Sequence, residues 1–98
     1  MIKLEPEQLA TVKSILRAHV PDCQVKVFGS RANGNPKPFS DLDLVLISKA
    51  PISDQKLSDL QEAFSESDLP IRVDVVDWTA ASKEFRGLME KNWVDVRG

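Results

Sequence analysis

The sequence lacks several features that would each point to a particular class of protein. It has a single cysteine, Cys23, so no disulfide can form within the chain. No stretch approaches the roughly 18 consecutive apolar residues of a membrane-spanning helix. No basic segment followed by an apolar one marks a secretory signal at its start. These absences predict a protein of the reducing cytoplasm with no membrane segment.

An excess of positive charge is also missing. The 98 residues include 13 Lys and Arg against 15 Asp and Glu, which gives a net charge of −2 at pH 7. Residues 1–40 hold six of the cations and three of the acids, whereas residues 41–98 hold seven cations and twelve acids. A broad nucleic-acid interface needs a clustered basic face. Nucleic acid is therefore not the expected partner, while a small anionic ligand remains compatible with the charge.

What is present fits one small folded unit. Hydrophobic residues make up 42% of the chain and charged residues 29%, a balance typical of globular proteins and unlike that of disordered ones. Single domains commonly contain about 100–200 residues. Since no repeat or flexible linker divides the chain, we expect residues 1–98 to form a single domain.

The spacing of apolar residues predicts alternating helices and strands. Prolines, glycines and capping residues separate these segments and place a loop over 34–38. The expected helices cover about 6–19, 30–33, a segment from a Ser53 cap to Phe64, and a segment from a Thr79 cap with Phe85, Leu88 and Met89 inward; the expected strands cover 24–28, 41–47, 71–76 and 93–96. This order predicts an α/β (α+β) fold, in which helices pack against a small mixed sheet of three to four strands.

Three aspartates are the first candidates for chemistry. Asp41 and Asp43 alternate with leucines along one expected strand, so both carboxylates point to the same face. Asp74 lies in the next strand, and all three carboxylates meet if the two strands are neighbours. Like charges so close together need a cation, and carboxylate oxygens favour Mg²⁺ or Mn²⁺ over zinc. Two such ions are suited to phosphoryl transfer.

A glycine-serine turn supplies a second candidate element. Gly29 and Ser30 follow directly on the expected strand 24–28. Glycine lets the backbone approach a phosphate closely, and backbone amides at a helix start attract the anion. Arg31 or Lys37 can add positive charge, although loop cations are more often simply solvated. The turn therefore predicts binding of a triphosphate.

The two elements together resemble a known family. Gly29 and Ser30, ten intervening residues, and then Asp41, Leu42 and Asp43 are similar to the signature of the DNA polymerase β-like nucleotidyltransferases. The longer segments 29–34 and 40–44 resemble the minimal nucleotidyltransferase (MNT) branch of that superfamily. The resemblance implies a nucleotidyltransferase core with two Mg²⁺ ions, or Mn²⁺ in their place. It also implies site residues: catalytic and metal-binding Asp41, Asp43 and Asp74, and nucleotide-binding Gly29, Ser30, Arg31 and Ser40.

The same resemblance implies an activity and a partner. Members transfer a nucleoside monophosphate, here expected to be AMP from ATP, to a hydroxyl group and release pyrophosphate. Minimal members are encoded beside a small helical protein of the HEPN or four-helix substrate-binding type, as the antitoxin of a toxin–antitoxin pair. The alternative is a non-catalytic nucleotide-binding regulator that neutralises or assists its partner by binding alone.

Two further assignments complete the expectations. Asp77 follows the third long strand directly, so we interpret it as a strand-end or capping acid rather than a member of the site. Trp78 and Trp93 fit either the core or a partner surface.

Overall fold

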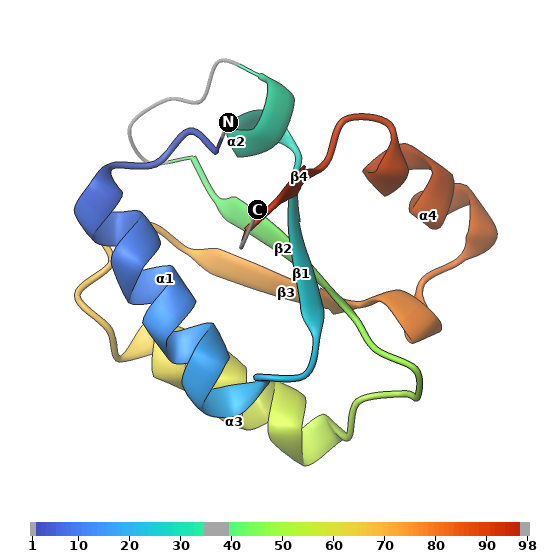
Figure 1. Ribbon diagram of the computed structural model, residues 1–98, viewed down its shortest axis with the longest axis horizontal. Coiled ribbons are helices and arrows are strands. Elements are labelled where there is room, and N and C mark those ends of the chain that lie inside the picture. Colours follow the sequence, from blue (N-terminus) through green and yellow to red (C-terminus); the bar gives the residue numbers. More distant parts are fainter. Residues whose placement is uncertain (1, 35–39, 97–98) are drawn as a thin grey trace.

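A four-stranded sheet with the strand order β3-β2-β1-β4 forms the centre of the computed structural model, which describes residues 2–34 and 40–96 (Figure 1). Strand β1 (Gln24–Phe28) pairs antiparallel with β2 (Leu42–Ile47) on one side and with β4 (Val94–Asp95) on the other. Strand β2 pairs parallel with β3 (Val73–Asp77). The predicted mixed sheet is therefore confirmed.

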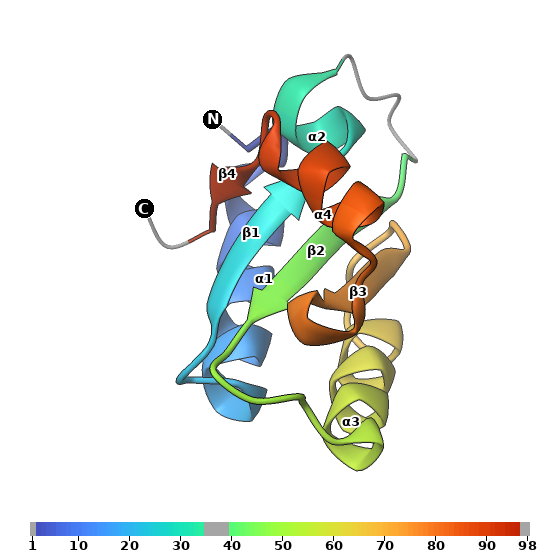
Figure 2. The same ribbon diagram turned by 90° about the vertical axis from the view of Figure 1, so that its right-hand side faces the viewer.

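The long helices cover one face of this sheet. Helices α1 (Pro6–His19) and α3 (Asp54–Ser65) lie on one side of the strands, whereas α4 (Lys83–Glu90) lies on the other (Figures 1 and 2). Apolar side chains of α1 and α3 meet alternate residues of β1 and β2 in the core; they include Val12, Leu16, Leu60 and Phe64 from the helices and Val25, Val27, Leu42, Leu44 and Leu46 from the strands. Because strand side chains alternate, Asp43 points to the opposite face.

Both long helices begin where the sequence predicts. Pro6 occupies the first turn of α1, and Glu5 forms a capping box with Gln8. The hydroxyl of Ser53 accepts a hydrogen bond from the Lys56 amide and caps α3. No helix in the described part of the chain is long and apolar enough to cross a membrane.

The predicted third strand and last helix need correction. The third strand covers 73–77 rather than 71–76. Thr79 does not cap the last helix, because it lies in a short 3₁₀ helix, η1 (Trp78–Ala80), and Ser82 caps α4 instead. The cause is Asp77, whose carboxylate accepts the Thr79 amide and starts this extra turn. The last strand is also shorter than predicted, and 35–38 of the expected loop lie outside the described residues.

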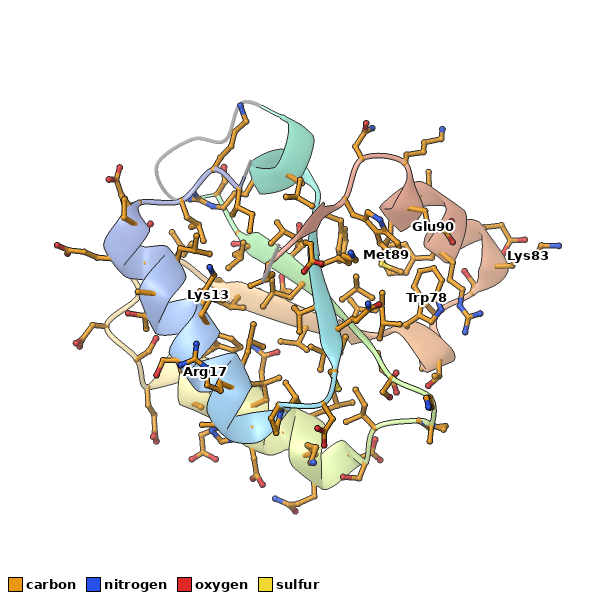
Figure 3. The ribbon with its side chains drawn as sticks, in the orientation of Figure 1. Lys13, Arg17, Trp78, Lys83, Met89 and Glu90 are labelled. Atoms are coloured by element: carbon orange, nitrogen blue, oxygen red, sulfur yellow. The ribbon has the colours of Figure 1, made fainter. Side chains whose placement is uncertain are left out.

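The orientation of α4 differs from the prediction as well. Of the three side chains expected to face inward, only Met89 is buried, while Phe85 is 37% and Leu88 65% exposed. Phe85 still packs toward the sheet, because its ring lies 5.8 Å from the ring of Phe28 in β1. Figure 3 shows Trp78 and Met89 between α4 and the strands, with Lys83 directed outward.

Aromatic contacts attach α4 to the sheet. The rings of Trp78 and Trp93 lie 5.4 Å apart, and the Arg86 guanidinium lies 4.9 Å from the Trp78 ring. Arg86 Nε also donates a hydrogen bond of 2.9 Å to the Trp78 carbonyl. Both tryptophans are half-buried and pack on each other. These contacts join α4 and the segment after it to η1, at the end of β3.

Candidate functional site

The three predicted aspartates lie along adjacent strands. Asp43 in β2 is the register partner of Asp74 in β3, and Asp41 immediately precedes β2. Register partners in neighbouring strands project to the same face of the sheet. The expectation that the two acid-bearing strands are neighbours is therefore confirmed.

Asp43 is electrostatically the most affected of the three. Burial raises the pKa of Asp43, and the nearby carboxylates of Asp74 and Asp41 raise this pKa further. Asp43 is half-buried, whereas Asp41 is exposed. Like charges that raise a pKa in this way repel one another. A bound cation would relieve that repulsion.

Asp74 has a partner that the sequence argument missed. Arg72 Nε lies 3.1 Å from Asp74 Oδ1 in a hydrogen-bonded ion pair. The sequence spacing could have predicted this pair, because Arg72 stands two residues before Asp74 and side chains at this spacing share one face of an extended segment. Arg72 supplies positive charge beside the third carboxylate.

The carboxylates are close but not gathered around one point. Within residues 2–34 and 40–96, no three Asp, Glu, His or Cys side chains are arranged to hold a metal ion. One oxygen of Asp74 is directed to Arg72. The donors themselves fit a hard divalent cation, because all three are carboxylates.

The glycine-serine turn lies against the same carboxylates. Gly29 joins β1 to the four-residue helix α2 (Ser30–Asn33), and it has a φ of 78°. A Cβ at this position would lie 2.7 Å from Asp43 Oδ2. Phe28, the preceding residue, is the register partner of Asp43. The strand pairing thus brings the predicted phosphate-binding turn beside the predicted metal ligands.

The Arg31 side chain contacts the backbone of two other segments. This side chain is buried, and its Nε donates a hydrogen bond of 3.0 Å to the Ser40 carbonyl. A terminal guanidinium nitrogen donates one of 2.8 Å to the Lys3 carbonyl, and the Lys3 amide donates to the Arg31 carbonyl. Arg31 thereby supports the backbone directly before Asp41. A nucleotide contact by Arg31 or Ser40 stays a prediction, and Lys37 lies outside the described residues.

Asp77 has a structural role, as expected. Its carboxylate accepts hydrogen bonds from the Thr79 amide and hydroxyl, each 3.0 Å long, and from the Ile52 amide at 3.1 Å. The side chain is buried and fully occupied in joining η1 to the segment before α3. The prediction that Asp77 is a capping acid is confirmed.

A stability measurement tests the carboxylate repulsion. The raised pKa means that the folded chain holds the Asp43 proton more tightly than the unfolded chain does. The contribution of this proton to the free energy of unfolding is fully present below the ordinary pKa of 3.8, and it is lost as pH rises through the raised pKa. Since asparagine cannot ionise, we expect Asp43→Asn to raise the free energy of unfolding at pH 7 by about 0.5–2 kcal/mol, the usual gain when a strained functional site is relieved.

Urea unfolding in metal-free buffer measures this difference. The gain of Asp43→Asn over the unaltered protein should shrink as pH falls below the ordinary pKa of aspartate. Mg²⁺ should stabilise the unaltered protein more than the variant, because only the former keeps all three carboxylates. A variant that is less stable than the unaltered protein at pH 7 would contradict the claim that the three carboxylates repel one another in the folded protein.

Carboxylates on adjacent strands beside a glycine turn are typical of domains that bind phosphate groups together with a divalent cation. Within this class, the chain belongs to the nucleotidyltransferase domain family, whose model matches residues 9–97. The family resemblance inferred from the sequence is confirmed.

Several known proteins are similar to this chain. Over 96 residues the chain is 47% identical to a Haemophilus influenzae protein named probable protein adenylyltransferase MntA, with 98% of this chain and 84% of that protein covered. A chain in a crystal structure of a toxin–antitoxin complex with AMP-PNP superimposes with a TM-score of 0.77 at 21% identity, over 90% of this chain and 71% of that one. A chain in the complex of a tri-AMPylated Shewanella oneidensis HEPN toxin with its MNT antitoxin gives 0.72 at 19% identity, over 95% and 71%. At these identities the structural matches show the common fold.

Proposed function

We propose that this nucleotidyltransferase transfers AMP from ATP to a hydroxyl group of a protein partner. In this reaction the hydroxyl oxygen forms a bond to the α-phosphorus, and the bond from that phosphorus to the oxygen of the β-phosphate breaks. Pyrophosphate leaves and the hydroxyl gives up its proton. The observation that carries the proposal is the register of Asp43 with Asp74 beside Gly29, because it combines metal ligands with a phosphate-binding turn.

Each site residue has a role in this proposal. Gly29 and Ser30 hold the β- and γ-phosphates through the turn. Asp41, Asp43 and Asp74 hold two divalent cations, most simply Mg²⁺, with Mn²⁺ as a chemically similar substitute. When bound, such ions neutralise charge on the α-phosphate and on the leaving group. Arg31 keeps the segment before Asp41 in place.

We further propose the identity of the partner. Similar proteins are named for protein adenylylation and for a complex with a HEPN toxin. By analogy, the acceptor is a hydroxyl side chain, such as that of tyrosine, on a small helical HEPN-type protein encoded nearby. The pair would act in the cytoplasm as toxin and antitoxin. Binding of the partner aligns the hydroxyl with the nucleotide, and such alignment lowers a reaction barrier substantially.

The alternative is a regulator that binds nucleotide and partner without transferring AMP. The ion pair of Asp74 with Arg72 is compatible with either function, because it engages one oxygen of Asp74. Against this alternative, a protein that had given up catalysis could lose one of the three acids, yet all three are present despite the burial and repulsion that raise the pKa of Asp43. We therefore favour catalysis.

Labelled ATP distinguishes the two functions. The protein is incubated with its co-purified partner, Mg²⁺ and ATP labelled at either the α- or the γ-phosphate. We expect label on the partner from the α-position alone, and none after chelation of the metal. A partner that is neutralised without acquiring label would support the binding regulator, and label from the γ-position would contradict AMP transfer.

A further inference from the structure

Asp41 is exposed, yet the backbone on both sides of it is held. The peptide group before Asp41 is held through the Ser40 carbonyl, which accepts the 3.0 Å hydrogen bond from Arg31 Nε. The peptide group after Asp41 is held through the Leu42 amide, which donates a hydrogen bond of 2.9 Å to the Arg72 carbonyl. Because peptide groups are planar, fixing both of them restricts the two backbone dihedral angles that direct the Asp41 side chain.

The first described residues of the chain hold Arg31 in turn. The Arg31 guanidinium donates a hydrogen bond of 2.8 Å to the Lys3 carbonyl, and the Lys3 amide donates one of 2.8 Å to the Arg31 carbonyl. Ile2 and Leu4, on either side of Lys3, pack against the core. Figure 1 shows this segment running beside α2. Residues 2–4, here called the N-terminal strap, are thus attached to the core by side chains and to Arg31 by backbone.

An arginine suits the junction between the strap and the segment before Asp41. Arg31 is only 6% exposed, and a buried charged group is costly unless hydrogen bonds compensate for the lost water. Its Nε and terminal nitrogens lie in one rigid plane, so the Ser40 and Lys3 carbonyls are bound in a fixed relative position. A lysine has one ammonium group on a flexible stem and does not reproduce this geometry.

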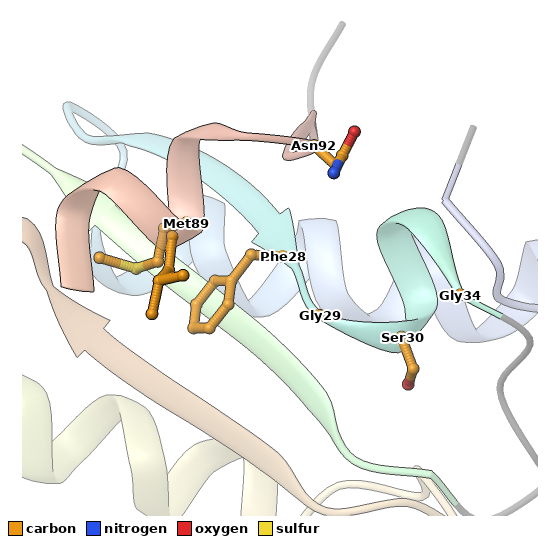
Figure 4. A pocket seen from close by; sticks show the side chains of 7 residues that line it. Phe28, Gly29, Ser30, Gly34, Met89 and Asn92 are labelled. Atoms are coloured by element: carbon orange, nitrogen blue, oxygen red, sulfur yellow. The ribbon is translucent and has the colours of Figure 1, made fainter. Parts of the chain in front are cut away.

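Arg31 also links the strap to the glycine-serine turn. It belongs to α2, and Figure 4 shows Gly29 and Ser30 where this helix begins and Gly34 where it ends. All three of these residues line a pocket of about 330 Å³. A helix of four residues has no rigid length to absorb a shift, so a displacement of Arg31 also displaces the turn.

We propose that the N-terminal strap is a positioning element of the site. Through Arg31 it sets the backbone of Asp41 relative to the glycine-serine turn, although neither Lys3 nor Arg31 contacts the reacting groups. The inference rests on the proposed function and deepens it, because it makes divalent-cation binding at Asp41 depend on residues 2–4.

Loss of this support should weaken the cation site without destroying it. Asp41 is one of the three proposed carboxylate ligands, and it binds a cation well only from the correct backbone position. Replacing a group that orients a metal ligand typically lowers metal affinity by about 10- to 100-fold. All three carboxylates remain in such a variant, so excess cation should restore binding.

Three substitutions separate backbone support from charge. Arg31→Lys keeps the charge and loses the planar group. Lys3→Pro removes the amide that donates to Arg31, whereas Lys3→Ala removes the same exposed side chain and keeps that amide. Electron paramagnetic resonance measures Mn²⁺ binding in the presence of AMP-PNP, without turnover. We expect Arg31→Lys to bind Mn²⁺ about 10- to 100-fold more weakly than the unaltered protein. Lys3→Pro should bind it about three- to tenfold more weakly than Lys3→Ala, the effect of one lost hydrogen bond.

AMP transfer at increasing Mn²⁺ gives a second measurement. The concentration for half-maximal rate should rise in Arg31→Lys, while the rate at saturating Mn²⁺ recovers most of its unaltered value. The control is Arg17→Ala, which removes an exposed cation from α1 and should bind Mn²⁺ as tightly as the unaltered protein.

Several results would overturn the inference and leave the proposed function intact. These are unaltered Mn²⁺ affinity in Arg31→Lys, equal affinity in Lys3→Pro and Lys3→Ala, and weaker AMP-PNP binding at unaltered Mn²⁺ affinity, which would assign Arg31 to the nucleotide. The expected Mn²⁺ affinities in a protein that transfers no AMP would support the inference and refute the proposed function. An unaltered protein that binds no Mn²⁺ with AMP-PNP would refute both.

Discussion

Asp43→Asn should lower AMP transfer at least about a thousandfold while the protein stays folded. The substitution removes one negative charge from the centre of the three carboxylates and changes the side-chain volume very little. Asp43 lies between Asp74 and the glycine turn, so it contacts the region in which metal and phosphate must meet. A lost metal ligand costs several kcal/mol of transition-state stabilisation, which corresponds to at least about three orders of magnitude in rate.

The control is Asp68→Asn, which removes the same charge from an exposed position between α3 and β3. It should transfer AMP at the unaltered rate. Because Asp43→Asn is also expected to be more stable in metal-free buffer, unfolding cannot account for its inactivity. Transfer by Asp43→Asn within tenfold of the unaltered rate would contradict the catalytic role of this carboxylate.

Gly29→Ala should impair both activity and folding. The φ of 78° at Gly29 is unfavourable for any residue with a Cβ, and the added Cβ would lie 2.7 Å from Asp43 Oδ2. Either the turn or the carboxylate must move. A displacement of about 1 Å at a reacting site costs on the order of a hundredfold in rate. The strained backbone should lower the free energy of unfolding by about 1–3 kcal/mol.

Gly87→Ala gives the opposite expectation for the same chemical change. Gly87 lies within α4, and a Cβ there would meet nothing within 4 Å. Alanine is favoured over glycine inside a helix by about 0.5–1 kcal/mol, so this variant should be slightly more stable and fully active. Rate assays and urea unfolding of both variants measure the contrast. Equal behaviour of the two would show that the turn geometry at Gly29 is unimportant.

The fold was predictable where local pattern and tertiary packing agree. Helix α1 has the predicted bounds because Pro6 and the apolar spacing are local signals that the core reinforces through Val12 and Leu16. The start of α4 was predicted wrongly because Asp77 competes for the Thr79 amide, and this competition depends on the contact of Asp77 with the distant Ile52 amide. The contact with Ile52 is tertiary and has no local signal, although the capping role of Asp77 itself was predicted.

The candidate site was predictable to a similar degree. Alternation along the expected strand 41–47 predicted that Asp41 and Asp43 share one face. The pairing of β2 with β3, which brings Asp74 beside them, depends on the tertiary structure. The sequence also suggested Arg31 as a phosphate ligand, because a cation beside a glycine turn is typical of one. Its burial against the Lys3 and Ser40 carbonyls depends on where the N-terminal segment packs.

The mass of the partner tests the central claim most directly. The protein and the product of the neighbouring reading frame are co-expressed and co-purified, and the intact mass of the partner is measured. We predict that the partner gains whole AMP increments with the unaltered protein and none when Asp41 and Asp43 are both replaced by asparagine. A partner of unmodified mass in the presence of the unaltered protein, ATP and Mg²⁺ would contradict the account.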